Sequence, residues 1–180
     1  MGTRTLLTAV LSAAVLGVAV TGCGSPDPTA ATAAPIDPTS AAVNAPGIPL
    51  GSEVTVAGIP GAIGSIRVSG SRSWARSSRP LSDPPREGAF VEVKVDARSI
   101  GTELFDLYPY DFYVADAAGH RFEYGVGMSF AEYGPDQIEG DRLAPGERLS
   151  GALLFDASPR ADRLVYAPYG LPLQTWRLQG

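Results

Sequence analysis

The strongest constraint on the fold is a two-residue alternation of apolar and polar side chains that begins after residue 50. The clearest example is AFVEVKVDAR, residues 89–98, in which every odd position is alanine or valine and every even position after Phe90 is charged. A period of two is typical of a β-strand with one buried face. We therefore expect the odd positions to face a core and the even positions to face mostly water.

Similar alternation recurs along the chain and predicts further strands at residues 53–56, 65–74, 110–115, 121–126, 148–156, 163–167 and 173–178. Turn sequences rich in glycine and proline separate them, such as APG at 144–146. No window shows a sustained helical period. About seven to nine short strands joined by such turns predict an antiparallel sandwich or barrel.

One of these strands carries a family resemblance. The segment LAPGERLSGALLFDAS, residues 143–158, resembles the signature of a domain-of-unknown-function family in bacterial lipoproteins. That family is part of the immunoprotective-extracellular, immunoglobulin-like (telokin-like) superfamily. Residues 143–147 match its L-x-P-G-E turn, and Gly151, Leu153 or Leu154, and Phe155 match the strand that follows.

The resemblance implies an all-β, immunoglobulin-like antiparallel β-sandwich of about seven to nine strands over roughly residues 51–178, and a surface location. It implies no catalytic residue and no cofactor, because the family has no general activity. The pattern itself adds a packing expectation. Alternation from Leu149 buries Leu153 and Phe155, and Gly151 lets a neighbouring strand or ring come close.

The N-terminus has the layout of an export signal. Arg4 precedes an uncharged, mostly apolar stretch, residues 5–20, and the only cysteine of the chain, Cys23, follows shortly after it. The sequence VTGC, residues 20–23, resembles the lipobox of bacterial lipoproteins. This resemblance implies that Cys23 receives a diacylglycerol with acyl chains such as palmitate and becomes the new N-terminus. The alternative is an ordinary secretory cleavage site with an incidental cysteine.

The predicted organisation has three parts: a lipoprotein signal peptide at 1–22, a lipidated cysteine with a tether at 23–50, and one globular domain at 51–180. The tether carries six prolines with much alanine and threonine, and too few large apolar side chains to form a core. Fully extended, it could reach about 80 Å. We expect the domain to stand clear of the extracytoplasmic face of the cell membrane, to which Cys23 holds it.

Charge and cysteine content exclude some classes of protein. The chain has 14 basic and 19 acidic side chains, and cleavage would remove Arg4 and no acid, which leaves a formal net charge of −6. Such an acidic chain opposes phosphate-rich polymers, so we expect no nucleic-acid partner. A single cysteine cannot form a disulfide within the chain, so the fold must rest on its hydrophobic core.

The best candidate for a binding surface is the basic stretch SRSWARSSRP, residues 71–80. Arg72, Trp74, Arg76 and Arg79 lie in it, and arginine makes forked contacts with phosphate and carboxylate groups. This stretch could contact anionic headgroups or acidic glycans. The alternative is a solvated loop, with Trp74 partly buried at a strand end.

The sequence predicts no catalytic site, no metal site and no cofactor. His120 is the only histidine, no G-x-S-x-G motif occurs, and the acidic loop at 132–141 lacks the spacing of a calcium loop. We therefore expect a non-catalytic envelope module for a protein or glycan partner. Two alternatives stay open: a glycan-acting enzyme that uses paired carboxylates, and a purely structural or antigenic surface protein. The sequence leaves the oligomeric state undefined.

Overall fold

The computed structural model describes residues 46–58, 61–80 and 82–178. The predicted signal peptide, Cys23 and nearly all of the predicted tether lie outside these residues. Among the described residues, no helix is long and apolar enough to cross a bilayer.

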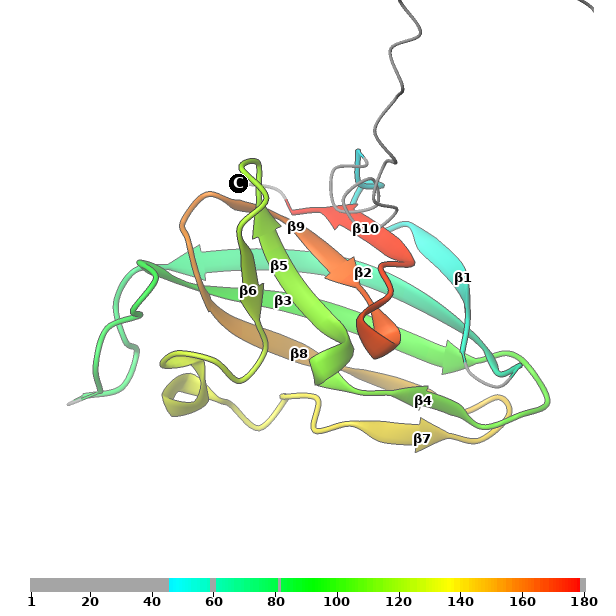
Figure 1. Ribbon diagram of the computed structural model, residues 1–180. Helices are drawn as coiled ribbons and strands as arrows, with labels where there is room; N and C mark the ends of the chain where they lie inside the picture. The colour runs from blue at the N-terminus through cyan, green and yellow to red at the C-terminus, as the bar shows by residue number, and fades with distance from the viewer. Residues whose placement is uncertain (1–45, 59–60, 81, 179–180) are drawn as a thin grey trace, which may run out of the picture. The chain divides into compact units, whose positions relative to one another are not determined.

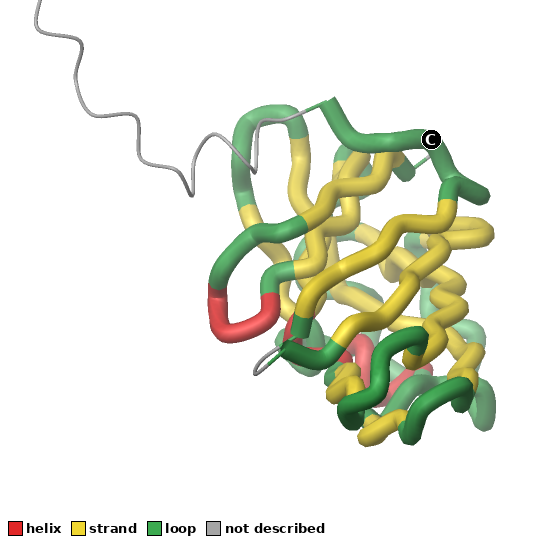
Figure 2. Tube along the Cα trace, turned by 90° about the vertical axis from the view of Figure 1, so that its right-hand side faces the viewer, coloured by secondary structure: helices red, strands yellow, loops and turns green. Residues whose placement is uncertain are grey.

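The described chain forms two four-stranded antiparallel sheets and one small two-stranded sheet (Figure 1). The first sheet has the order β1 (Glu53–Ala57), β2 (Ile63–Trp74), β3 (Ala89–Ser99), β8 (Arg148–Ala157). The second has the order β10 (Gln174–Arg177), β9 (Ala161–Tyr166), β5 (Phe112–Asp116), β6 (Arg121–Glu123). In the third, β4 (Phe105–Leu107) pairs with β7 (Asp141–Leu143). The only helical segments in the described residues are three 3-10 turns, η1 (Pro109–Asp111), η2 (Ser129–Glu132) and η3 (Pro168–Gly170), shown in red in Figure 2.

The core lies between the two larger sheets, as the alternation predicts. Val93, Val95 and Phe155 from the first sheet share one buried cluster with Val114 and Trp176 from the second, and all five are at most 1% exposed. Burying a side chain of this size contributes about 1.5–3 kcal/mol. Within the described residues the fold therefore rests on apolar packing.

The predicted strand boundaries differ most from the structure at β6. Alternation predicts a strand over 121–126, but β6 ends at Glu123. Gly125 and Gly127 adopt φ angles of 73° and 79°, which turn the chain away from the extended conformation. The strands β4 and β7 were not predicted, because three residues are too few to show a period.

The expectation that the even positions of β3 face water is wrong at one end of the strand. Phe90 is 0% exposed and Glu92 is 9% exposed, although both lie on the outer face of the first sheet. The Trp74 ring lies 5.9 Å from the Phe90 ring, and η2 packs against β8, so that this end of the outer face is covered. The covering segments create the wall of the site described below.

The edge of β8 is also covered. Gln137 forms a parallel bridge with Ala152, in which the Ile138 N–H donates to the Ala152 carbonyl at 3.0 Å and the Ala152 N–H donates to the Asp136 carbonyl at 2.7 Å. A Cβ at Gly151 would lie 2.7 Å from that same Asp136 carbonyl oxygen. The expectation that Gly151 permits close approach of a neighbouring strand is confirmed.

The fold begins upstream of Gly51, the predicted start of the domain. The Ile48 N–H donates to the Thr175 carbonyl at 3.0 Å, and the Arg177 N–H donates to the Ile48 carbonyl at 2.8 Å. These bonds add Ile48 to the edge of the second sheet beside β10 as a parallel bridge with Trp176.

Candidate functional site

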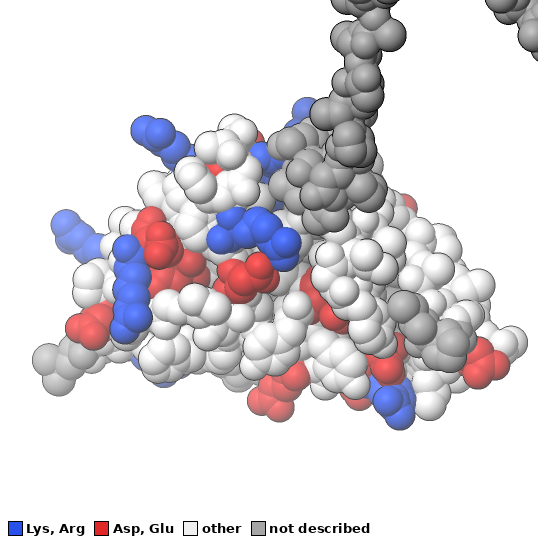
Figure 3. Space-filling model, viewed as in Figure 1, with Lys and Arg blue, Asp and Glu red and all other residues white. Residues whose placement is uncertain are grey.

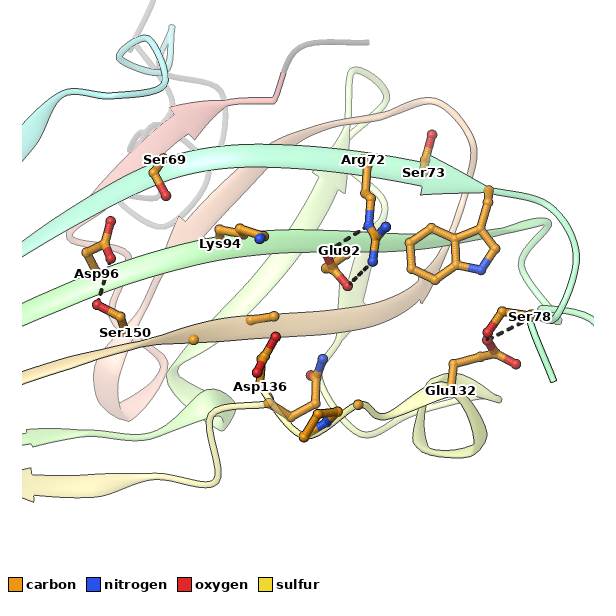
Figure 4. A pocket seen from close by; sticks show the side chains of 16 residues that line it. Ser69, Arg72, Ser73, Ser78, Glu92, Lys94, Asp96, Glu132, Asp136 and Ser150 are labelled. Atoms are coloured by element: carbon orange, nitrogen blue, oxygen red, sulfur yellow. Dashed lines mark hydrogen bonds and ion pairs between the residues drawn. The ribbon is translucent and has the colours of Figure 1, made fainter.

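An open groove of about 850 Å³ lies on the outer face of the first sheet (Figure 4). Its floor is formed by β2, β3 and β8, and its walls come from the loop after β2 and from the segment that follows η2. Its lining residues are Ser69, Arg72, Ser73, Trp74, Ser78, Glu92, Lys94, Asp96, Glu132, Gly134, Pro135, Asp136, Gln137, Ser150, Gly151 and Ala152. Most of these side chains are polar, which distinguishes the groove from the apolar pockets typical of drug-sized ligands.

At one end of the groove, Arg72, Glu92 and Trp74 form a fixed group. The Arg72 Nε and Nη2 groups both donate to the Glu92 carboxylate at 2.8 Å, a forked ion pair across β2 and β3. The guanidinium carbon lies 5.0 Å from the centre of the Trp74 ring. Because Arg72 already has a carboxylate partner, it offers little net positive charge to a ligand.

The wall beyond Trp74 is held by Glu132, which is 8% exposed. Its carboxylate accepts hydrogen bonds from Ser77 Oγ, from the Ser78 N–H at 3.0 Å and from Ser78 Oγ at 2.5 Å. Burial raises the pKa of Glu132, but these hydrogen bonds together outweigh burial and hold the pKa below its usual range. The Arg79 guanidinium donates to the neighbouring Tyr133 carbonyl, which holds the same two segments together.

A second buried carboxylate, Asp156, also holds these segments in place. It is 3% exposed and accepts three backbone N–H bonds, from Arg86 and Glu87 at 2.9 Å and from Met128 at 2.7 Å. The chain can pass this close to the carboxylate because residue 127 is glycine, where a Cβ would collide with Asp156. The two segments that form the wall of the groove are therefore held together by shared hydrogen bonds and do not behave as independent loops.

The centre of the groove is open around Lys94. On the two neighbouring strands the residues opposite Lys94 are Gly70 and Ala152, so no large side chain lies directly across from it. A Cβ at Gly70 would meet nothing within 4 Å. Lys94 forms no ion pair or hydrogen bond with any residue that the structure describes.

A carboxylate without an ion-pair partner among the described residues faces Lys94 from across β8. Figure 4 shows Asp136 and Lys94 on opposite sides of this strand. Lys94 pairs with Ala152, and Ala152 pairs with Gln137, the neighbour of Asp136. Two strand spacings separate Lys94 from Gln137, about 10 Å between their backbones. By contrast, Asp96 accepts a hydrogen bond from Ser150 Oγ at 2.7 Å and lies 3.6 Å from Arg67.

Two buried polar atoms at the groove lack hydrogen-bond partners. Among the described residues, four buried side-chain polar atoms form no hydrogen bond, and two of them, Trp74 Nε1 and Gln137 Oε1, belong to groove residues. Buried polar groups in native proteins almost always have a partner, and each exception requires a cause. Both atoms are inaccessible to solvent, so a ligand in the groove reaches them only if the Trp74 and Gln137 side chains move.

The predicted binding residues separate into two groups. Arg72 and Trp74 line the groove, whereas Arg76 and Arg79 do not. The basic stretch forms no continuous positive surface here, because Glu92 pairs with Arg72 and a backbone carbonyl accepts from Arg79. On the face seen in Figure 3, basic and acidic side chains are likewise interspersed.

The sequence interpretation missed Lys94, Asp136 and Gln137. The alternation of residues 89–98 does place Lys94 on the outer face, but nothing in it shows that glycine and alanine flank it. In the part of the chain that the structure describes, no three His, Cys, Asp or Glu side chains come together as a metal site. Cys23 lies outside the described residues.

No protein-family model matches the sequence, and a search of curated proteins gives no match. Solved structures do resemble the chain. MPT63, a secreted protein from Mycobacterium tuberculosis, has 24% sequence identity and a TM-score of 0.55, and the match covers 74% of this chain and 98% of MPT63. The yjhA protein from Bacillus subtilis has 15% identity and a TM-score of 0.54, with 73% of this chain and 99% of that chain covered.

These likenesses define the fold and not the ligand. The chain is an all-β protein with an immunoglobulin-like antiparallel sandwich, as the sequence predicts. It has ten strands in its described residues, more than the seven to nine expected, because of the short pair β4 and β7.

Proposed function

We propose that the protein is a lipid-anchored, extracytoplasmic binding protein whose groove over β2, β3 and β8 holds an envelope glycan. The observation that carries the proposal is the open centre of the groove, where neither Lys94 nor Asp136 has an ion-pair partner among the described residues. The side chains of Trp74 and Gln137 also line this groove. A groove with such groups and a rigid wall is suited to take up a polar ligand.

The lining favours a glycan over an extended peptide. Sugar hydroxyls both donate and accept hydrogen bonds, which matches a lining of serine hydroxyls, carboxylates and an amide. The indole of Trp74 offers an apolar surface for the C–H face of a sugar ring. A peptide that binds as an added strand needs a free sheet edge, and residues 136–138 already occupy the edge of β8.

Lys94 offers one positive group to an acidic substituent of the glycan. Lys94 stands opposite Gly70 and Ala152 at the centre of the groove, where its ammonium group can bind a carboxylate on the ligand. Asp136, across β8, would accept hydrogen bonds from hydroxyl or amino groups farther along the same ligand.

The groove carboxylates support binding rather than catalysis. A glycan hydrolase needs a carboxylic acid with a raised pKa to protonate the leaving oxygen. Glu132 has a lowered pKa, and Glu92 and Asp96 are held by Arg72 and by Ser150. No observation in the groove favours the hydrolase alternative.

The anchor is proposed from the sequence alone. Two acyl chains on Cys23 would hold the protein at a membrane, because one chain binds only marginally. The secreted status of MPT63, which shares the fold, fits an extracytoplasmic location. Cys23→Ala should leave an uncleaved precursor or release the protein from the membrane fraction, as immunoblots of fractionated cells would show. Normal maturation and membrane retention of this variant would contradict the lipid anchor.

The groove is tested by filling it. Gly70→Leu places a bulky side chain in the open space beside Lys94, with no atom within 4 Å of the new Cβ. We expect this variant, in the chain from Gly24 to Gly180, to fold normally and to lose capture of soluble glycan fragments from the envelope of the producing organism. Thr55→Leu is the matched control, because it adds the same side chain to an exposed position on edge strand β1, away from the groove. Equal capture by both variants would place the site elsewhere.

A further inference from the structure

A second cavity, of about 80 Å³, lies where η1, η3 and β4 meet, and it shares no residue with the groove. Its lining includes three tyrosines and two aspartates: Tyr108, Tyr166, Tyr169, Asp106 and Asp111. A single water needs about 10–15 Å³ by this kind of measure, so the cavity has room for one compact ligand group.

The aromatic side of the cavity is built with a local backbone cost. Tyr169 has a φ of 55° and is the only residue other than glycine with positive φ among the described residues. This conformation costs on the order of 1 kcal/mol or more for such a side chain. Burial of the ring does not offset that cost, because Tyr169 is 69% exposed. The turn between Pro168 and Gly170 thus presents an aromatic ring to solvent at the cavity.

The acidic side of the cavity has spare capacity for a cation. Asp106 pairs with Arg142 at 2.8 Å, but Asp111 forms no ion pair within the described residues and accepts only a long bond, 3.4 Å, from the Tyr108 N–H. Tyr166 is 1% exposed, and none of the described residues forms a hydrogen bond with its hydroxyl group.

The ionisable groups that line the cavity have shifted pKa values. Burial, together with the nearby charge of Asp106, raises the pKa of Asp111. Burial and the charges of Asp111, Tyr169 and Asp106 raise the pKa of Tyr166. Both shifts are caused mainly by burial, and the nearby carboxylates add to them.

We propose that this cavity binds an alkylammonium group. Tyr108 and Tyr169 line the cavity, and a cation that contacts the face of a tyrosine ring is attracted by the ring quadrupole. The Asp111 carboxylate accepts a charge-assisted contact from it, and the Tyr166 oxygen is available as a further acceptor. The group could belong to a small quaternary ammonium compound or to a lysine side chain of another protein. The inference is independent of the groove and of its ligand.

The test is an NMR titration of the ¹⁵N-labelled chain from Gly24 to Gly180 with three probes. Choline represents the free cation, Nα-acetyl-lysine amide represents the protein-borne one, and 3,3-dimethyl-1-butanol is the neutral isostere of choline. We expect saturable shifts in the millimolar range for at least one cationic probe, confined to amides around η1 and η3. The neutral isostere should bind at least about tenfold more weakly.

Two variants keep the test decisive. Asp111→Asn should weaken binding of the cationic probe about tenfold, whereas Asp83→Asn, at an exposed acid outside the cavity, should leave it unchanged. Tyr169→Gly removes the ring and relieves the positive φ, so it should fold at least as well and also lose binding. Choline binding alone identifies a small cation, and lysine amide binding alone identifies a protein side chain. Equal binding of the neutral isostere, shifts elsewhere, or no saturable shift with either cation would overturn the proposal.

Discussion

The wall and the centre of the groove differ in how their polar groups are satisfied. In the wall, Asp156 accepts three backbone N–H bonds and Glu132 accepts three bonds from two serines. In the centre, Lys94 and Asp136 have no ion-pair partner among the described residues, and the buried oxygen of Gln137 has no donor. The polar groups of the wall therefore stabilise the fold, whereas those of the centre are available to bind a ligand.

This difference separates two roles that sequence alone merges. Acidic residues are abundant in this chain, and nothing in their spacing distinguishes them. Their surroundings in the structure distinguish them. A buried carboxylate with several hydrogen-bond donors stabilises the fold, whereas an exposed carboxylate without partners is available for binding. Substitutions in the wall should therefore change stability first, and substitutions in the centre should change affinity alone.

The largest effect is expected for Asp156→Ala. Removal of the carboxylate leaves three backbone N–H groups without their acceptor, so the free energy of unfolding should fall by about 3 kcal/mol. Urea denaturation followed by tryptophan fluorescence measures it. The matched variant in the centre, Asp136→Ala, should change stability by no more than about 0.5 kcal/mol. Equal losses in the two variants would remove the distinction between wall and centre.

A smaller, pH-dependent effect is expected for Glu132→Gln. The pKa of Glu132 is lowered in the folded protein, so its carboxylate adds stability that is fully present above the unfolded pKa of about 4.3 and is lost as pH falls through the folded pKa. The wild type should be more stable than the variant at pH 7, and the gap should close in strong acid. Urea midpoints at pH 7, pH 5 and pH 3 follow the gap. A gap that is constant with pH would show that the charge of Glu132 contributes nothing.

The smallest effect on stability is expected for Lys94→Ala, which removes an exposed side chain without a partner among the described residues. Unfolding should be unchanged within about 0.5 kcal/mol, while affinity for the captured glycan should fall about tenfold. Arg98→Ala is the control, since it removes another exposed cation from the same face of β3 outside the groove. Equal binding by the two variants would argue against a carboxylate contact at Lys94.

Much of the fold could be predicted from the sequence, because the core depends on a strong local signal. The alternation from Ala89 to Arg98 places the inner face of β3 correctly, and Gly151 lies against residues 136–138 as the pattern predicts. The burial of Phe90 and Glu92 could not be predicted in this way. It depends on η2 and its flanking loops, which fold over the sheet from more than 25 residues farther along the chain.

Less of the site could be predicted. Arg72 and Trp74 were identified because they stand out in a basic stretch, but the charges that oppose this stretch lie in distant segments, at Glu92 and Glu132. The open space around Lys94 depends on a register shift between Val68 and Gly70, which brings a glycine opposite the lysine. Such a shift leaves no trace in a two-residue pattern.

The most direct test of the groove uses the two indole N–H signals of the protein. The chain has two tryptophans, and the Nε1 groups of both Trp74 and Trp176 are buried without a hydrogen-bond partner among the described residues. Trp74 lines the groove, whereas Trp176 is 0% exposed in the core, so it is an internal control. In a ¹H–¹⁵N titration with the captured glycan fragments, the Trp74 indole signal should shift because the ligand packs beside its ring, and the Trp176 signal should stay fixed. Saturable binding that leaves the Trp74 signal unmoved would contradict the groove as the binding site.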